Sequence, residues 1–459
     1  MSIATGLAGR TRSSTANAPD PSGAERLTWT MRVVIPALVI CVYYLDVLRI
    51  AGLPPRLVIT ALLITILITG VGPHGPMVTV PGVGYLIALV LVACGYALSS
   101  LVSGSPVASA NSQRFLVTFP IAIAAGWVLA CSRAGLAYLA RTIAAVGTLT
   151  AVPAIVEFVS GRSLLGRDAE FETYVRGDAA RAVVGAEHPL ILGVLFCVAV
   201  PFAYRGIRRW WLRWACVVLL VAGVYVTGSR GPLGVSIGVL LVLAVPGFAR
   251  FIARHFGTLI FVVMVGLGVL WYFASRVWQP VTTSTDTLAN SMEYRAAIYS
   301  LLPRILLSQP FGYGLGDLPQ NTWLIRSPNQ IQDLTMTVDS QWVLSAMRLG
   351  WIGVLAVFLL AAIAVLALRR RLDYGVALFV FTGCGTFVAL DAWDGAGSLW
   401  MLLTGVCVRL LSYAPHTLEA RFTGEPDENA RAAHPPPALT IGSGGPDRPT
   451  RRRPRAQEN

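Results

Sequence analysis

The sequence contains no lysine, so all 36 of its basic residues are arginines. A GC-rich genome accounts for this bias because lysine codons are AT-rich; a need for guanidinium groups is the alternative. Charge of either sign is scarce, since only 13% of the 459 residues are charged while 55% are hydrophobic, and the mean hydropathy is +0.65. This composition excludes an ordinary water-soluble domain and indicates a polytopic membrane protein.

The sequence also lacks cysteines at the spacing of disulfide or metal sites, and it lacks a cluster of basic residues that would bind nucleic acid. The formal net charge of +13 comes from arginines at the ends of apolar runs and in the tails, which is typical of topology signals. The seven cysteines all fall within apolar runs, at Cys41, Cys94, Cys131, Cys197, Cys216, Cys384 and Cys407. We therefore expect small packing residues, with neither a disulfide framework nor a metal cluster and with no nucleic-acid partner.

Long apolar runs recur along the chain. They lie at about 33–51, 56–72, 83–103, 115–132, 136–158, 189–204, 211–228, 232–248, 257–274, 342–368, 375–391 and 397–413. Because a spanning helix needs roughly twenty apolar residues, we expect an all-α protein with about 12 transmembrane helices in residues 31–413. Residues 1–30, which carry no cleavable signal, and the Pro-, Gly- and Arg-rich residues 414–459 are expected to be disordered cytosolic tails.

Arginine placement predicts the orientation. With the N-terminus in the cytosol, the inward segments hold Arg133, Arg205, Arg208, Arg209, Arg213, Arg250, Arg254, Arg369, Arg370, Arg371, Arg451, Arg452, Arg453 and Arg455. The outward segments are 160–188, the Ser229-Arg230 turn, 275–341 and Asp391–Asp394, and they carry mixed charge. Since cytosolic loops are rich in basic residues, this contrast favours two cytosolic termini.

The stretch Trp278–Gly353 contains a polar interruption of about sixty residues, too long for a simple connection. Apolar residues recur there at helical spacing, at Met292, Ile298, Leu301, Leu302, Ile305 and Leu306. We expect an extracytoplasmic loop, 275–341, with an amphipathic helix on the outer leaflet that ends at Pro310 and the glycine-rich turn Gly312–Asp317. That turn lacks the preceding strand and the glycine spacing of a nucleotide-binding motif.

Polar residues also gather at the expected outer boundary. The loop 160–188 combines arginines, among them Arg181, with acidic residues and ends at His188. The turn Gly228-Ser229-Arg230-Gly231-Pro232 places Arg230 between two apolar runs. A guanidinium group forms paired charge-assisted bonds to phosphate oxygens, so these arginines suit a phosphate or diphosphate ligand; anchoring to lipid headgroups is the alternative.

Charges inside or beside the runs are few. Asp46 and Arg49 lie one turn apart and are expected to pair at the interface, and Glu157 stands near the outer end of the fifth run. Arg141 and Arg409 lie close enough to the inner membrane surface for their side chains to reach it with the charged group.

Four of these stretches together resemble the O-antigen ligase and polymerase family of bacterial polysaccharide assembly. They are Gly185–Gly193 with His188-Pro189, Thr227–Pro232, Arg295 through Pro310 to Gly316, and Asp339–Gly353. Their order and their relation to the apolar runs also match, over about residues 115–410. The resemblance implies a multi-pass glycosyltransferase of the bacterial plasma (inner) membrane, with an extracytoplasmic active site and neither metal nor cofactor.

The resemblance further implies a polyprenyl-diphosphate-linked glycan donor and a glycan or lipid acceptor. The acceptor hydroxyl attacks the anomeric carbon and polyprenyl diphosphate leaves, so preorganised arginines would stabilise the leaving charge. The diphosphate candidates are Arg230 and Arg295, with Arg181 weaker, and the other expected substrate-binding residues are His188, Ser229, Gln341 and Arg348.

One position departs from the ligase branch, which has a histidine near the start of the span after the large loop. Here Asp339-Ser340 stands in that place, as in many polymerase-like members, so the chain resembles polymerases more than lipopolysaccharide ligases. Asp339 either acts as the base for the acceptor hydroxyl, orients the acceptor, or pairs with Arg348. His188 either joins the site or only begins a helix beside Pro189.

Two other functional classes stay open. The first is a lipid-linked oligosaccharide flippase or another secondary carrier, which also has about twelve spans but is expected to show two related halves. This chain has one large, late loop and no internal repeat. The second is a non-catalytic scaffold of envelope assembly, which the missing histidine permits.

Overall fold

The computed structural model describes the chain in separate stretches: residues 27–70, 111–165, 181–245, 298–299, 301–316, 318–320, 322–327, 330–333, 338, 340–370, 373–386, 388–390 and 394–412. The expected tail 414–459, nearly all of the expected tail 1–30, and the apolar runs at 83–103 and 257–274 lie outside the described residues.

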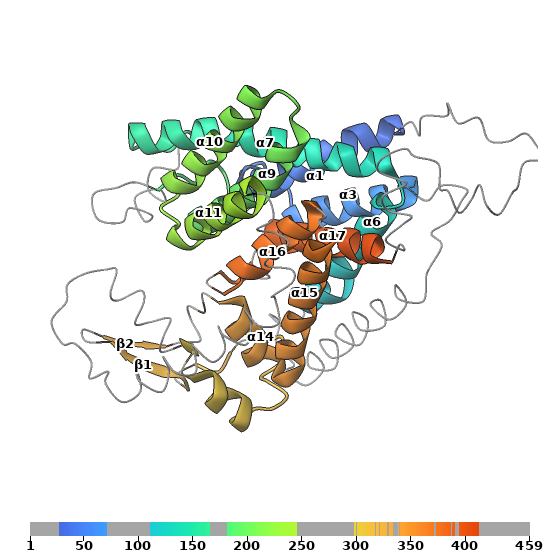
Figure 1. Ribbon diagram of the computed structural model, residues 1–459. Coiled ribbons are helices and arrows are strands. Elements are labelled where there is room, and N and C mark those ends of the chain that lie inside the picture. Colours follow the sequence, from blue (N-terminus) through green and yellow to red (C-terminus); the bar gives the residue numbers. More distant parts are fainter. Residues whose placement is uncertain are drawn as a thin grey trace, which may run out of the picture. The chain divides into compact units, whose positions relative to one another are not determined.

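Most of the described chain is helical (Figure 1). The first half contains α1 (Trp29–Tyr43), α2 (Leu45–Ile50), α3 (Pro55–Gly70), the π-helical turn Arg114–Thr118, α6 (Phe119–Leu129), α7 (Arg133–Ser160), α9 (Pro189–Gly206), α10 (Trp210–Val226) and α11 (Arg230–Ala244). The second half contains a helix at 301–308, α14 (Gln341–Leu349), α15 (Trp351–Arg369), α16 (Asp373–Cys384) and α17 (Asp394–Leu411).

Four helices in the described stretches are long and apolar enough to cross a membrane: Asn111–Leu129, α7, α9 and α15. Shorter apolar helices accompany them, including α1, α3, α10 and α16. These helices support the interpretation that the chain is a membrane protein. The expected number of twelve spans stays a prediction.

The all-α expectation is confirmed for the described chain, to which the structure adds one short antiparallel hairpin of β1 (Leu324–Ser327) and β2 (Gln330–Asp333). One expectation about local structure was wrong. The apolar run at 342–368 is not one span, because Gly350, with φ +57° and ψ −135°, divides it into α14 and α15. Residues with a Cβ atom do not adopt this backbone conformation without strain, so the division depends on glycine.

Close backbone packing joins helices from opposite ends of the chain. A Cβ atom at Gly126 of α6 would collide with the carbonyl oxygen of Leu402 in α17, and one at Gly405 of α17 would collide with that of Ile123. Small residues that let helix backbones touch are a common device of membrane proteins, where van der Waals packing replaces the hydrophobic effect between helices.

Several contacts bring together the helix ends that carry most of the described arginines. Tyr138 of α7 donates to the carbonyl oxygen of Arg32, Tyr374 of α16 donates to that of Leu136, and Arg205 of α9 pairs with Asp373 at 2.9 Å. We name this group of helix ends the basic end; its arginines are Arg32, Arg133, Arg205, Arg208, Arg209, Arg213, Arg369 and Arg370, and Asp373 is its one acidic residue among those that the structure describes.

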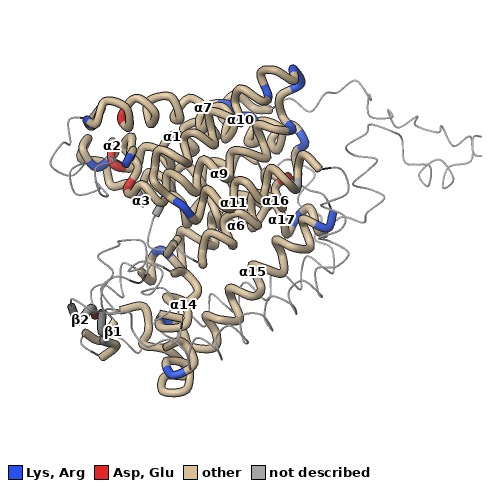
Figure 2. The backbone as a smooth tube through the Cα atoms, turned by 60° about the vertical axis from the view of Figure 1, so that its left-hand side comes forward, with Lys and Arg blue, Asp and Glu red and all other residues tan. Residues whose placement is uncertain are grey.

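The opposite ends of the same helices carry mixed charge, as Figure 2 shows near α2, where acidic and basic residues lie together. This mixed end holds Asp46, Arg49, Glu157, Arg162, Arg181, Glu187 and Arg230. The contrast between the two sets of loops, noted from the sequence, therefore corresponds to two ends of one group of helices.

Candidate functional site at the mixed end

The turn between α10 and α11 is held by Arg181. Its Nε donates to the carbonyl oxygen of Thr227 at 2.8 Å, and the backbone N–H of Ala182 donates to the carbonyl oxygen of Val226 at 3.1 Å. Gly228 has φ +63°, and a Cβ atom there would lie 3.0 Å from Arg181 Nε. Glycine is needed here both for the left-handed backbone and for the approach of the guanidinium group.

His188 begins α9 directly beside this turn. Its Nδ1 accepts the backbone N–H of Leu190 at 3.1 Å, so the neutral ring carries its proton on Nε2. Burial, and secondarily the positive charge of Arg181, lower the pKa of His188 to about 4. His188 is therefore neutral at pH 7 and acts as a helix cap.

Ser229 joins the starts of α9 and α11. Its side chain is buried, with 2% exposed, and its Oγ donates to the carbonyl oxygen of Pro189 at 3.4 Å. A Cβ atom at Gly193 would lie 2.8 Å from Thr227 Oγ1, so this glycine lets the turn pack on α9. Ser229 thus fixes the turn, and its hydroxyl points into protein.

Arg230 is the exposed member of the group. It is the first residue of α11, where the partial positive charge of the helix N-terminus disfavours a cation. No residue in the described stretches forms an ion pair with it. Since α9 begins at the same place, two helix N-termini and the cations Arg181 and Arg230 concentrate positive potential there, which suits an anion.

Glu157 secures the segment that carries Arg181 and His188. It is 1% exposed, and its carboxylate accepts the backbone N–H groups of Leu164, Val183 and Val184 at 2.9–3.0 Å. Val184 has φ +46°, a conformation that is strained for a β-branched residue. The sequence predicts Glu157 near the outer end of the fifth apolar run but does not predict this role. The one indication was that a carboxylate is rare in an apolar run.

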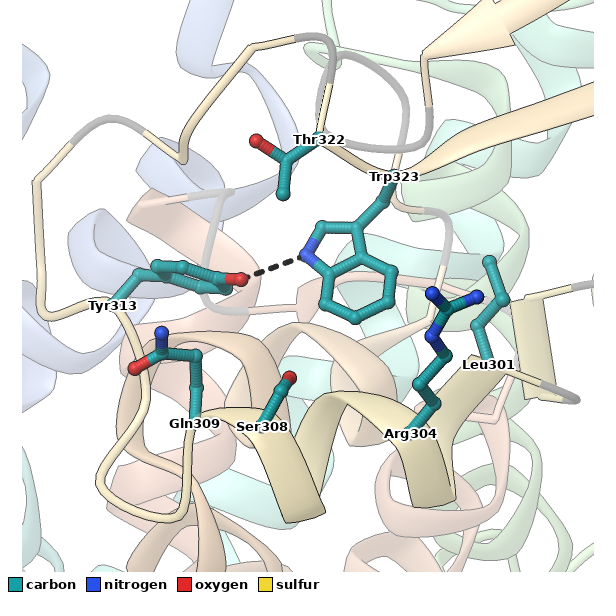
Figure 3. A pocket seen from close by; sticks show the side chains of 7 residues that line it. All are labelled: Leu301, Arg304, Ser308, Gln309, Tyr313, Thr322 and Trp323. Carbon is teal, nitrogen blue, oxygen red and sulfur yellow. Dashed lines mark hydrogen bonds between the residues drawn. The ribbon is translucent and has the colours of Figure 1, made fainter.

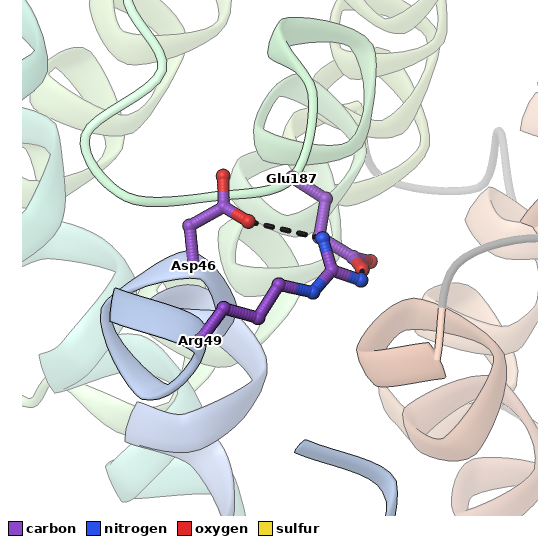
Figure 4. Close-up of polar contacts among 3 residues, drawn as sticks. All are labelled: Asp46, Arg49 and Glu187. Atoms are coloured by element: carbon purple, nitrogen blue, oxygen red, sulfur yellow. Dashed lines mark hydrogen bonds and ion pairs between the residues drawn. The ribbon is translucent and has the colours of Figure 1, made fainter. Parts of the chain in front are cut away.

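The acidic side chains beside this segment are already paired. Arg49 of α2 contacts Asp46 at 3.1 Å and also pairs with Glu187, the residue before His188 (Figure 4). The expected Asp46–Arg49 pair is confirmed, and Glu187 is its third member. The backbone N–H of Asp46 donates to the carbonyl oxygen of Gly185 at 2.9 Å, which ties α2 to the segment before α9.

The remaining expected site residues lie elsewhere or are not described. Gln341 begins α14, is buried, and donates from its side chain to Ser345 Oγ at 3.0 Å, so its amide is engaged within the helix. Arg348 is half-buried in the last turn of α14. Asp339 and Arg295 lie outside the described residues. Among the described residues, the contacts above bring together Arg181, His188, Ser229 and Arg230.

A second polar arrangement surrounds α14. The backbone N–H of Gln341 donates to the carbonyl oxygen of Gly385 at 2.8 Å, and the hydroxyl of Tyr299 lies 2.8 Å from Ser340 Oγ and donates to the carbonyl oxygen of Thr386 at 2.6 Å. These bonds hold the residue after Asp339 against the turn that follows α16. Tyr299 was not singled out from the sequence.

The helix at 301–308 is amphipathic as expected, and its buried apolar residues pack on protein. Ile298 and Ile305 are buried in a cluster with Trp323, Val343 and Met347, so α14 covers that face. The turn that ends this helix is fixed as well, because Trp351 donates its backbone N–H to the carbonyl oxygen of Pro310 at 3.0 Å. The expected position of this helix on the outer leaflet stays a prediction.

No known protein family matches this chain, and no curated protein is similar to it. Among the described residues no cluster of three histidine, cysteine or carboxylate side chains is placed to hold a metal ion. The six cysteines that the structure describes are unpaired.

Proposed function

We propose that this chain is a membrane glycosyltransferase of bacterial cell-envelope biogenesis, of the O-antigen ligase and polymerase type. It transfers or polymerises glycan from a polyprenyl-diphosphate-linked donor, such as undecaprenyl diphosphate glycan, onto a glycan or lipid hydroxyl. The observation that carries the proposal is the exposed guanidinium of Arg230 at the start of α11, which has no ion-pair partner among the described residues and lies beside Arg181 and the N-terminus of α9. Such a group suits a diphosphate.

The arginine-rich basic end supports a cytosolic location for that end, because basic loops are retained in the cytosol. The Arg230 turn at the other end then faces the extracytoplasmic side. The proposal includes about twelve spans, both termini in the cytosol and a large outward loop, 275–341.

The proposed reaction needs stabilisation of a leaving anion. The acceptor oxygen bonds to the anomeric carbon while the bond from that carbon to the diphosphate oxygen breaks, and the electron pair stays on the diphosphate. Arg230 stabilises this charge, and His188, neutral at the start of α9, helps to form the site. The hydroxyl proton passes to a base, for which Asp339 is the proposed residue, and Arg295 is a proposed second diphosphate ligand.

The test is the glycan phenotype of a deletion strain complemented with wild type, Arg230→Ala or Arg162→Ala. Arg162 is a matched control because it is also exposed and lies in the loop after α7 at the mixed end. We expect wild type and Arg162→Ala to restore long chains, while Arg230→Ala accumulates lipid-linked units on the outer face. Full restoration by Arg230→Ala at equal protein level would refute the site, and units confined to the cytosolic face of the deletion strain would favour a carrier.

A further inference from the structure

The pocket beside the helix at 301–308 contains aromatic and polar side chains and lies apart from the Arg230 turn in the sequence. We propose that it binds an acidic pyranose, a sugar ring with a carboxylate, as one residue of a glycan. Its volume is about 360 Å³, and it is lined by Leu301, Arg304, Ser308, Gln309, Tyr313, Thr322 and Trp323 (Figure 3). Ligand pockets commonly measure about 300–1,000 Å³, so this one suits a small ring.

Two aromatic rings are held in a fixed arrangement at the pocket. Trp323 Nε1 donates to the hydroxyl of Tyr313 at 2.9 Å, so each ring satisfies the polar atom of the other. Trp323 is 7% exposed and Tyr313 is half-buried, so most of the ring surface at the pocket belongs to Tyr313. This carbon surface suits the apolar C–H face of a pyranose, while the sugar hydroxyls need polar partners at the edge.

Such partners come from the helix and from the segment before β1. Ser308, Gln309 and Thr322 are exposed at the pocket and offer hydroxyl and amide groups. The side chain of Gln309 forms no hydrogen bond with other residues in the described stretches. An amide both donates and accepts, which matches the mixed donor and acceptor character of sugar hydroxyls.

Arg304 selects for negative charge. Its guanidinium carbon lies 6.0 Å from the centre of the Trp323 ring, its side chain is exposed, and no carboxylate in the described stretches pairs with it. Arginine binds planar carboxylates through two parallel N–H bonds. A neutral sugar would leave this cation unused, so the pocket fits a uronic-acid-like ring better.

The pocket is preorganised by its neighbours. Trp323 packs with Ile305 and Met347 in the cluster beneath it, and the backbone N–H of Tyr313 donates to the carbonyl oxygen of Met347 at 2.8 Å. The buried side chain of Asn111 donates to the carbonyl oxygen of Leu315 at 2.7 Å. Because these contacts fix the residues around the pocket, little conformational entropy is lost when a ligand binds. This matters for a small ligand, which forms few contacts to offset such a loss.

The experiment measures binding directly, by saturation-transfer difference NMR on the full chain in phosphatidylcholine nanodiscs. The probes are methyl glucuronide and methyl glucoside at equal concentration. We expect wild type to give about tenfold more transfer to the glucuronide. Arg304→Gln is expected to remove this preference. If Arg304→Gln kept the preference for the glucuronide, the proposal that Arg304 binds the sugar carboxylate would be overturned.

A second pair of variants tests the location. Ser308→Trp fills the pocket from an exposed helix position, while Leu307→Trp places the same ring at the adjacent residue, which is 81% exposed and outside the lining. We expect loss of glucuronide transfer in Ser308→Trp alone. Equal signals in both variants would overturn the site. This readout does not depend on the proposed transferase reaction, since Arg230→Ala should keep the signal even where transfer is lost.

Discussion

Arg181 Nε lies 2.8 Å from the carbonyl oxygen of Thr227 and donates to it. This bond joins the segment that leads into α9 to the turn that leads into α11, two stretches about fifty residues apart that the sequence marked separately. Arg181 therefore positions the turn, and Arg230, three residues after Thr227, is exposed at its end. The two arginines differ in role: one holds the site and the other is available to a ligand.

His188 should give the protein a defined pH dependence. Its pKa is lowered from 6.5 to about 4 in the fold, so between these values the unfolded chain binds a proton that the folded chain does not. Stability is then fully present above pH 6.5 and is lost as the pH falls toward 4, by roughly 1–3 kcal/mol. Asparagine also caps helices but does not titrate.

Thermal unfolding of the detergent-solubilised protein at several pH values checks this. The melting temperature of His188→Asn should fall less than that of wild type over the same range, because all other titrating groups are shared. Parallel curves for the two proteins would contradict the buried, neutral histidine.

Replacing Glu157 by glutamine should loosen the segment before α9. The carboxylate accepts three backbone N–H groups, whereas an amide would direct its own N–H groups at one or more of them. We expect a loss of about 1–3 kcal/mol in unfolding free energy, measured as a lower melting temperature. Arg162→Gln, at an exposed neighbouring position, should change little. If Glu157→Gln were as stable as this control, the proposal that Glu157 supports the segment before α9 would be contradicted.

Gly350→Ala should be far more damaging than Gly52→Ala. Both glycines have positive φ, +57° and +71°, but a Cβ atom at Gly350 would collide with the carbonyl oxygen of Pro310, while nothing lies within 4 Å of one at Gly52. We expect a cost of about 3 kcal/mol or more at Gly350 and about 1–2 kcal/mol at Gly52. Similar melting temperatures for the two variants would mean that the α14–α15 division is not held by this contact.

Orientation can be tested with a membrane-impermeant maleimide on intact spheroplasts. Arg162→Cys at the mixed end should be labelled, and Arg208→Cys at the basic end should be labelled only after lysis; both positions are exposed. The parent protein provides the background, because five of its six described cysteines lie in apolar helices and the sixth, Cys131, lies in the turn between α6 and α7. The reverse pattern would invert the proposed topology.

Hydropathy predicted the helices well because burial in lipid or protein requires long apolar segments. It could not place the division at Gly350, since the run is continuously apolar and the break depends on contacts with Pro310, forty residues earlier. Periodicity also predicted the helix at 301–308, but a helical pattern does not specify what covers the apolar face. The hairpin carried no recognisable signal.

The site was predictable in part. The polar residues at the expected outer boundary predicted Arg181, His188, Ser229 and Arg230 as site residues, and the structure places these four together. The bonds that hold them, above all the three to Glu157, join segments distant in sequence and cannot be derived from spacing. Asp339 and Arg295 lie outside the described residues, so their roles stay predictions.

The central claim, that Arg230 binds the leaving diphosphate through a guanidinium fork, is tested most directly by transfer from a polyprenyl-diphosphate glycan in nanodiscs. Wild type, Arg230→Lys and Arg162→Lys are compared at equal protein level. A lysine keeps the charge but cannot form two parallel bonds, so we predict that Arg230→Lys is slower by about tenfold or more while Arg162→Lys matches wild type. Transfer by Arg230→Lys at the wild-type rate would contradict the account.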